Sequence, residues 1–336
     1  MNKKRRPNLQ DVADLVGVTK MTVSRFLRDP QQVSIPVQQK LEQAINHLGY
    51  INNRAPSMLS AAKSQAIGVL VPSLTNQVFA EVIRGIESIT DSANYQTMLA
   101  HYSYCPDQEE KHIASLLSYN IDGLLLSDTE HNPRTIQMLK TSGIPIIEMM
   151  DTRSSHIGIA VGFDNKRAAS NMTETLIKKG YDRVVYLAAR LDKRTELKYQ
   201  GYQQAMLKHQ LNPVQISTQS ASSFSLGAQL LQQTLDEHPQ TNAIFCTNDD
   251  LAVGAIFECQ RQGIKVPDNM AIAGFHGHDI GQAIVPKLTT VMTPREAIGQ
   301  TAAKALLAQL DPKGNHDDTV QSTIDLGFSI HLGEST

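Results

Sequence analysis

A repeating order of apolar run, polar turn and amphipathic segment governs the chain from residue 61 onward. The apolar runs have the composition of parallel strands buried on both faces, and they cover residues 66–71, 123–126, 145–147, 184–187, 243–246 and 270–274. Apolar residues recur at helical spacing between them, for example over 79–93, 108–118, 165–179, 197–209, 225–237 and 251–262. This alternation predicts a doubly wound α/β core. Because roughly ten strand–helix units exceed what one open sheet usually carries, we expect two similar subdomains.

Ligands of such sheets bind beyond the carboxyl ends of the strands. That rule selects the loops 72–77, 101–104, 127–128, the stretch around Asp151, 189–195, 247–250 and 275–279. These loops are rich in hydroxyls, amides and carboxylates, with a few cations. A polyhydroxylated ligand needs that mixture, because each buried hydroxyl must find a donor or an acceptor.

The first fifty residues follow a different pattern. Apolar residues recur at helical spacing over 9–16, and Gly17 supplies the left-handed conformation that ends a helix. Thr19 is a good N-cap for a second helix over 20–27, and a third is expected over 34–48. The pattern predicts a helix-turn-helix motif whose second helix lies in the major groove of DNA. The alternative is a three-helix module that merely packs on another surface.

The distribution of charge supports the DNA-binding interpretation. Residues 1–60 carry nine Lys and Arg against four Asp and Glu, whereas the remainder carries 22 against 29. A small basic module joined to an acidic one is typical of a chain whose first part meets a polyanion. Residues 51–63 read as a hinge: either a tether, or a segment that DNA orders so that Leu59 wedges into a minor-groove step.

Other function classes lack their signatures. The sequence has no GxGxxG after its first strand, no Walker-type loop, no GxSxG and no HExxH, so we expect no enzyme and no cofactor. His276 and His278 alternate in a loop, which rarely aims two ligands at one metal ion. Asp249 and Asp250 resemble a paired acid and base, but a helix N-terminus attracts carboxylates for electrostatic reasons alone. Three distant cysteines and the absence of an apolar leader favour the cytoplasm.

Several motifs resemble the LacI/GalR family of bacterial repressors. They are Leu9–Ala13, Gly17–Thr19, Thr22–Arg25, Leu48–Arg54, Ile67–Val69, Gly85–Glu87, Ile121–Leu124, Gly143–Pro145, Phe245–Asp249, Gly274–Phe275 and Leu288–Val291. Within that family, Arg54–Pro56, Pro72–Glu81 and Ala273–Gly281 resemble the repressors of gluconate utilisation more specifically. The resemblance covers essentially the whole chain.

The resemblance implies a homodimer that binds a pseudo-palindromic operator in double-stranded DNA, and a core similar to periplasmic sugar-binding proteins. The expected parts are a helix-turn-helix domain (1–50), a hinge (51–63) and an effector-binding and dimerisation core (64–336). The core would consist of approximately 64–162 with 292–322, and 163–291 with 323–336. Effector binding would change the arrangement of the subdomains and hence the hinge, so the response is allosteric.

Site residues carry over position by position. Lys20 and Met21 match the main base-reading residues, and Leu59 matches an intercalating hinge leucine. The whole DNA-contact set is Thr19, Lys20, Met21, Thr22, Ser24, Arg25, Asn53, Arg54 and Leu59. The effector-binding set is Asn76, Phe79, Asp151, Arg194, Lys198, Asn248, Asp249 and His276. Pro56 departs from the alanine of many relatives, which shifts or delays a hinge helix.

A second departure points to the chemistry of the effector. His276 stands where relatives commonly carry an aspartate, and a histidine can donate to a carboxylate. With Arg194 and Lys198 nearby, we expect a sugar acid such as gluconate. A phosphorylated aldonate or another sugar remains an alternative, because the same cations would serve it. We expect the effector to release the operator, with co-repression as the alternative.

Each candidate also has a simpler explanation. Phe79 would then be a core residue of its helix, Arg194 and Lys198 would be solvated, and Asp249 would only stabilise a helix N-terminus. Met21 would be an exposed helix residue without a base contact. Arg25 would contact phosphate only, which positions a protein on DNA without specifying sequence.

Overall fold

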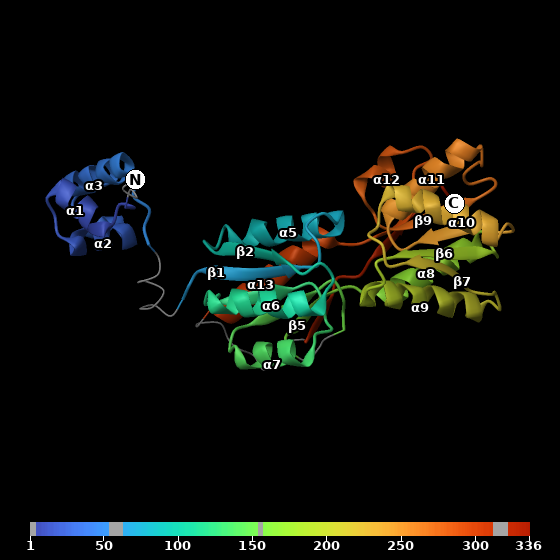
Figure 1. Ribbon diagram of the computed structural model, residues 1–336, viewed down its shortest axis with the longest axis horizontal. Helices are drawn as coiled ribbons and strands as arrows, with labels where there is room; N and C mark the ends of the chain where they lie inside the picture. Colours follow the sequence, from blue (N-terminus) through green and yellow to red (C-terminus); the bar gives the residue numbers. More distant parts are fainter. Residues whose placement is uncertain (1–4, 54–62, 154–156, 312–321) are drawn as a thin grey trace. The chain divides into compact units, whose positions relative to one another are not determined.

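The computed structural model describes residues 5–53, 63–153, 157–311 and 322–336 (Figure 1). The described chain divides into two compact units, residues 1–64 and 65–336. Each unit has its own hydrophobic core.

The first unit is a three-helix module. It contains α1 (Leu9–Val16), α2 (Lys20–Arg28), the 3-10 turn η1 (Pro30–Gln32) and α3 (Ile35–Leu48). Thr19 caps α2 as expected, with its hydroxyl accepting from the backbone N–H of Thr22, and Gly17 ends α1 at φ +75°. The small core consists of Val12, Ala13, Val23, Phe26, Leu41, Ala44 and Tyr50. The three predicted helices are therefore confirmed.

The second unit begins with a six-stranded parallel sheet in the order β11-β5-β4-β3-β1-β2. Its strands are β1 (Ala66–Val71), β2 (Gln96–His101), β3 (Gly123–Leu126), β4 (Ile146–Met149), β5 (Ile159–Gly162) and β11 (Thr323–Asp325). The helices α5 (Gln77–Thr90) and α13 (Arg295–Leu310) cover one face, and α6 (Pro106–Ser118) and α7 (Pro133–Thr141) cover the other. We call this sheet with its four helices the first lobe.

A second six-stranded sheet has the order β12-β10-β9-β8-β6-β7, and only β12 runs antiparallel to its neighbour. Its strands are β6 (Val184–Ala189), β7 (Val214–Thr218), β8 (Ala243–Cys246), β9 (Ala271–His276), β10 (Thr289–Met292) and β12 (Ser329–His331). The helices α8 (Asn165–Lys178) and α9 (Lys193–Lys208) cover one face, and α10 (Phe224–Glu237) and α11 (Asp249–Gln262) cover the other. Together with the short α12 (Asp279–Ala283) they form the second lobe (Figure 1).

The described chain passes between the lobes at three places. It crosses after β5, after β10 and after β11. We expected residues 323–336 to belong to the second lobe, but β11 pairs with β5 in the first, so the last crossing follows Asp325. A three-residue strand at a sheet edge leaves no periodicity that would place it from the sequence.

Candidate functional sites

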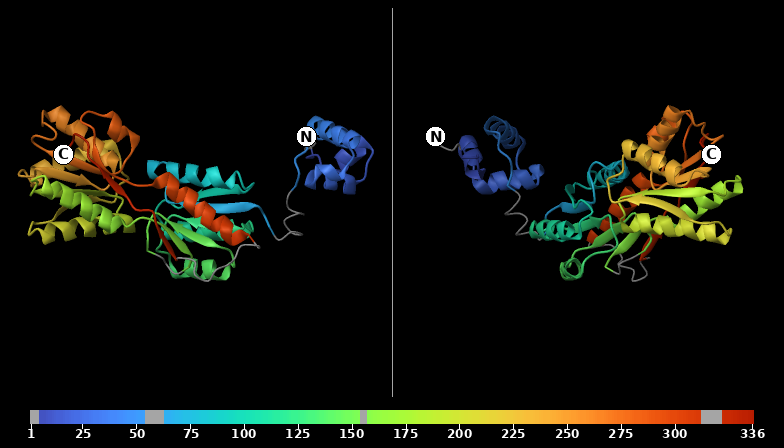
Figure 2. Two further views of the ribbon diagram at one scale, coloured as in Figure 1. Left: turned by 180° about the vertical axis from the view of Figure 1, so that it is seen from behind. Right: turned by 45° about the vertical axis from the view of Figure 1, so that its right-hand side comes forward.

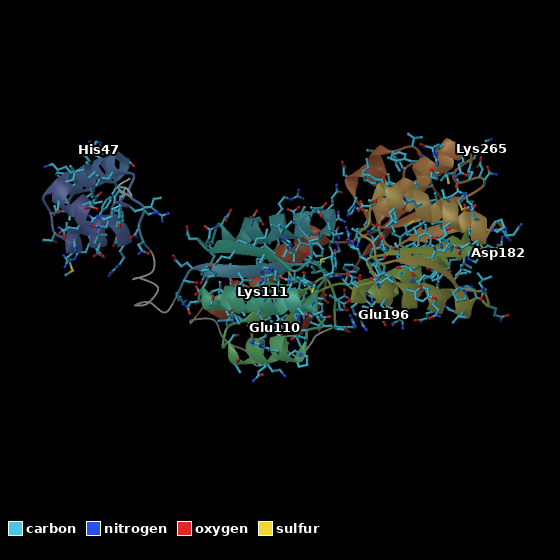
Figure 3. The ribbon with its side chains drawn as sticks, viewed as in Figure 1. His47, Glu110, Lys111, Asp182, Glu196 and Lys265 are labelled. Carbon is cyan, nitrogen blue, oxygen red and sulfur yellow. The ribbon has the colours of Figure 1, made fainter. Side chains whose placement is uncertain are left out.

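A pocket lies among the loops that follow the strands of both lobes. Its lining consists of Asn76, Val78, Phe79, Tyr104, Met150, Ala189, Arg190, Asp192, Arg194, Thr195, Lys198, Thr247, Asn248 and His276. Glu196, which Figure 3 labels, lies in the first turn of α9 and follows the lining residue Thr195. It shows the reader where the second lobe borders the pocket. The strand-end rule therefore located the pocket.

Arg194 connects the lobes across this pocket. It is only 9% exposed, its Nη2 lies 3.1 Å from Asp192 Oδ2, and its Nη1 donates to the carbonyl oxygen of Ser127 in the first lobe. The guanidinium carbon also lies 5.6 Å from the centre of the Phe79 ring. Burial would raise the pKa of Asp192, but the charge of Arg194 and the N–H of Thr195 lower it. Arg194 is thus buried and hydrogen-bonded within the protein, so the simpler explanation of it as a solvated surface cation is wrong.

Lys198 lies on the next turn of α9 and is 4% exposed. Its Nζ lies 3.1 Å from the carbonyl oxygen of Thr247 and 3.0 Å from Nε2 of His276. Burial lowers the pKa of Lys198 to about 7, against the opposing charge of Asp192. Burial and the nearby Lys198 hold the pKa of His276 well below its usual value. His276 is therefore neutral, with Nε2 as acceptor and the proton on Nδ1, which lies 3.2 Å from Thr293 Oγ1.

Amide and hydroxyl groups form the rest of the polar wall. Asn76 caps α5 with its Oδ1 and donates from Nδ2 to the hydroxyl of Tyr104 at 3.1 Å. Asn248 caps α11 and accepts from the hydroxyl of Ser222 at 2.9 Å. Arg190 lies 5.6 Å from the centre of the Tyr104 ring. Phe79 packs in the core and also lines the pocket.

Two expected effector residues do not line the pocket. Asp249 is 0% exposed, and its carboxylate accepts from the hydroxyl of Thr290 at 2.7 Å and from the backbone N–H of His278 at 2.5 Å. Asp151 is 3% exposed and bonds Arg153 and Asn165. Both carboxylates accept hydrogen bonds from the protein and so support the loops behind the pocket wall.

Five polar lining residues were absent from the expected set: Tyr104, Arg190, Asp192, Thr195 and Thr247. All five lie in loops that the strand-end rule had selected. Their side chains could not be assigned because a loop sequence does not indicate which side chains turn inward.

The helix α2 presents a polar and partly apolar surface. Lys20, Met21 and Arg25 are exposed, and the apolar side chain of Met21 is 66% accessible. Thr22 and Ser24 are half-buried, and the hydroxyls of Thr19 and Thr22 lie 3.0 Å apart. Asn53 is exposed beyond α3, whereas Arg54, Pro56 and Leu59 lie outside the described residues, and with them most of the expected hinge.

A helix-turn-helix unit in the same chain as a two-lobed α/β core with a polar pocket defines a class of ligand-responsive DNA-binding regulators. Residues 8–53 match the family model described as bacterial regulatory proteins, lacI family. Residues 64–329 match the model described as periplasmic binding proteins and sugar binding domain of LacI family. The chain belongs to the LacI family, and it is a DNA-binding transcriptional repressor rather than an enzyme.

Individual relatives agree with this assignment. The chain is 56% identical to the HTH-type transcriptional regulator GntR of Escherichia coli (strain K12), and the match covers 99% of each chain. It is 42% identical to the regulator IdnR of the same strain, again over 99% of each. A crystal structure of a LacI-family transcriptional regulator from Silicibacter pomeroyi superposes with a TM-score of 0.91 at 28% identity, covering 98% of this chain and 99% of the other.

Two further observations concern the described part of the chain. None of its helices is long and apolar enough to cross a membrane. Nor do its His, Cys, Asp and Glu side chains form a group of three or more arranged to hold a metal ion.

Proposed function

We propose that the chain acts as a homodimer in the cytoplasm, represses genes of sugar-acid utilisation, and is released from its operator when gluconate or a related aldonate binds between the lobes. The charge of the pocket lining is the observation that carries the choice of effector. Arg190, Arg194 and Lys198 face a single carboxylate, Asp192. Because Asp192 pairs with Arg194, two cations stay available for a ligand anion.

The remaining polar groups suit the hydroxyls of the same ligand. Asn76, Asn248, Tyr104 and Thr247 offer both donors and acceptors along the wall. A carboxylate stabilises the charged form of the buried Lys198 amine, whose pKa lies at about 7, whereas a neutral sugar offers it no opposite charge. An acid with several hydroxyls satisfies both halves of the lining.

For DNA, we propose that α2 enters the major groove with Lys20 and Met21 at base edges. Thr19, Thr22, Ser24 and Arg25 would then support these contacts, and Asn53 would act near the hinge. One head reaches only one half-site, so a dimer is needed for tight and specific binding. We propose that Asn76, Phe79, Arg194, Lys198, Asn248 and His276 contact the effector, with Asp151 and Asp249 acting behind them.

Calorimetric titration of the full chain with gluconate, 6-phosphogluconate and galactose tests the proposal, each with and without a palindromic operator duplex at fixed salt. We expect affinity for gluconate that drops when operator is bound. Preference for 6-phosphogluconate would change the effector within the same mechanism. Higher effector affinity on the operator would indicate co-repression, and no heat from any of the three would refute the choice of a sugar acid.

Two variants separate the two sites. Arg25→Ala should weaken operator binding and leave gluconate affinity unchanged, with Lys40→Ala on an exposed face of α3 as the matched control. Lys198→Met should weaken gluconate binding while operator binding is retained. Unchanged operator affinity in Arg25→Ala would remove its assigned role.

A further inference from the structure

Arg295 is a buried cation where the chain passes from β10 of the second lobe into α13 of the first, with 3% of its surface exposed. Its guanidinium makes a two-point ion pair with Glu81 of α5: Nε lies 3.1 Å from Oε2 and Nη2 lies 2.7 Å from Oε1. Nη1 donates to the carbonyl oxygen of His276, and Nη2 lies 3.4 Å from that of Gly277. One side chain therefore ties the first lobe to the backbone of a pocket loop in the second.

The anchor of this side chain in the first lobe is stiff. The helices α5 and α13 lie side by side (Figure 2) and approach each other closely at two glycines. A Cβ at Gly85 would collide with the carbonyl oxygen of Glu296, and one at Gly299 would collide with that of Val82. Such backbone contacts leave little room for the helices to slide, so Glu81 and Arg295 keep their relative position.

The end of the tie in the second lobe is a strained residue. His276 has φ +104°, a conformation that non-glycine residues rarely adopt and that surrounding contacts must hold. The direction of its imidazole follows from this backbone, and the ring reaches Lys198 in the pocket at 3.0 Å. The bond from Arg295 to the His276 carbonyl thus bears directly on where the imidazole points.

Helix α5 contributes both to the pocket lining and to the ion pair with Arg295. Asn76 caps α5 and lines the pocket, Phe79 follows within its first turn, and Glu81 lies two residues further on. Pocket contacts on α5 and pocket contacts at His276 are consequently joined by the Glu81–Arg295 pair. The motif Pro72–Glu81 includes Glu81, but neither Glu81 nor Arg295 was among the expected site residues.

We propose that Arg295, held by Glu81, is a positioning residue that keeps His276 in its place in the effector pocket and links occupancy of that pocket to the arrangement of the lobes. The inference rests on the proposed function, because it takes the pocket as the effector site. An effector shifts an equilibrium only through contacts that differ between the two states. A rotation of the second lobe would carry the two carbonyls away from the guanidinium, so the tie exists in one arrangement and not in the other.

The chain offers a matched control on the same two helices. Arg84 of α5 and Glu296 of α13 form an exposed ion pair, 2.6 Å between Nη2 and Oε2, which does not involve the pocket loop. The test compares Arg295→Lys and Glu81→Gln with Arg84→Lys. Lysine keeps the charge at 295 but cannot hold the carboxylate at two points while donating to two carbonyls. Glu81→Gln leaves the guanidinium intact, so it serves if Arg295→Lys fails to fold.

The first measurement needs no effector. Amide hydrogen exchange is followed on peptides covering residues 275–279, where the N–H of Gly277 lies 3.3 Å from Thr290 Oγ1. We expect exchange there to be at least about tenfold faster in Arg295→Lys and Glu81→Gln, and unchanged in Arg84→Lys. Exchange equal to that of the control would overturn the positioning role, whatever the effector is.

The second measurement is the ratio of operator Kd with and without D-gluconate. In Arg295→Lys we expect this ratio to fall by about tenfold relative to wild type, and in Arg84→Lys to stay unchanged. A ratio retained in Arg295→Lys would refute the link between pocket and lobes. If wild type itself shows no response to D-gluconate, the effector assignment fails, and hydrogen exchange alone decides the positioning role.

Discussion

The stability of the first lobe should depend on pH through one buried histidine. His131 lies in the loop between β3 and α7, and its side chain is fully buried. Nδ1 lies 3.0 Å from Glu109 Oε1 on α6, and Nε2 lies 3.3 Å from Glu148 Oε1 on β4. Burial alone would lower the pKa of His131, but hydrogen bonds to Glu109 and Glu148 outweigh it and raise the pKa to about 9. Only the imidazolium can donate to both carboxylates.

The magnitude follows from this shift. The ordinary pKa of 6.5 rises to about 9 in the folded state, and at 1.36 kcal/mol per pKa unit the protonated form adds about 3 kcal/mol to the free energy of unfolding. Because the folded state binds the proton more tightly, this contribution is complete below pH 6.5. It declines as the unfolded chain loses its proton and is gone once the pH has risen through the folded-state pKa. Roughly 2 kcal/mol should remain at pH 7.5.

The assay is urea unfolding of wild type and His131→Gln between pH 6 and pH 10. Far-ultraviolet circular dichroism is the suitable probe, because the chain has no Trp for fluorescence. His101→Gln, an exposed position on β2 of the same lobe, is the matched control. We expect the difference between wild type and His131→Gln to shrink by about 3 kcal/mol from pH 6 to pH 10. A difference that does not change with pH would refute the charged bridge.

Three further outcomes are expected. Gluconate affinity should fall as pH rises through about 7, the pKa of Lys198, because the anion favours the charged amine; calorimetry in two buffers of different ionisation enthalpy should show proton uptake that Lys198→Met abolishes. Gly85→Ala should destabilise the core by about 1–3 kcal/mol, since the new methyl group meets the backbone of α13, and a shift of the thermal midpoint no larger than that of Ala80→Ser would contradict this. Thr19→Ala should lower the stability of the first unit by about 1 kcal/mol through loss of its cap on α2, which limited proteolysis followed at residues 5–53 can measure; a proteolysis rate equal to wild type would remove the cap's role.

The strands that the sequence located are buried on both faces, although β5 and β10, which are also largely buried, were not predicted. The expected runs at 66–71, 123–126 and 243–246 coincide with β1, β3 and β8. The edge strands β2 and β7 were not predicted, because an edge strand keeps exposed polar residues and therefore lacks a continuous apolar run. Helix α13 was not expected either: its buried residues include Gly299, Ala302 and Ala303, and small residues give little hydrophobic periodicity.

The site could be predicted as far as loops, and only partly as side chains. Strand ends fixed which segments meet, and the resemblance to the LacI family chose Asn76, Arg194, Lys198 and His276 within them. The place of Asp249 behind the pocket wall could not be predicted, because its family position says nothing of the Thr290 hydroxyl and the His278 N–H that its carboxylate accepts from. Arg295 could not be found, because it follows β10, which was not predicted, and acts across the lobes.

The pocket's cations divide by how much hydrogen-bonding capacity the protein leaves them. Arg194 donates to Asp192 and to the Ser127 carbonyl, so part of its hydrogen-bonding capacity is used within the protein. Its main effect is to connect the two lobes. Lys198 has three donors, of which Thr247 and His276 take two. The third donor, on an amine whose pKa lies near 7, gains most from a carboxylate that restores its full charge. The acid group of an aldonate should therefore lie toward Lys198, with its hydroxyl chain toward Asn76 and Asn248. A Lys198→Met variant tests this orientation, because we expect it to lose the preference of the protein for gluconate over the uncharged lactone.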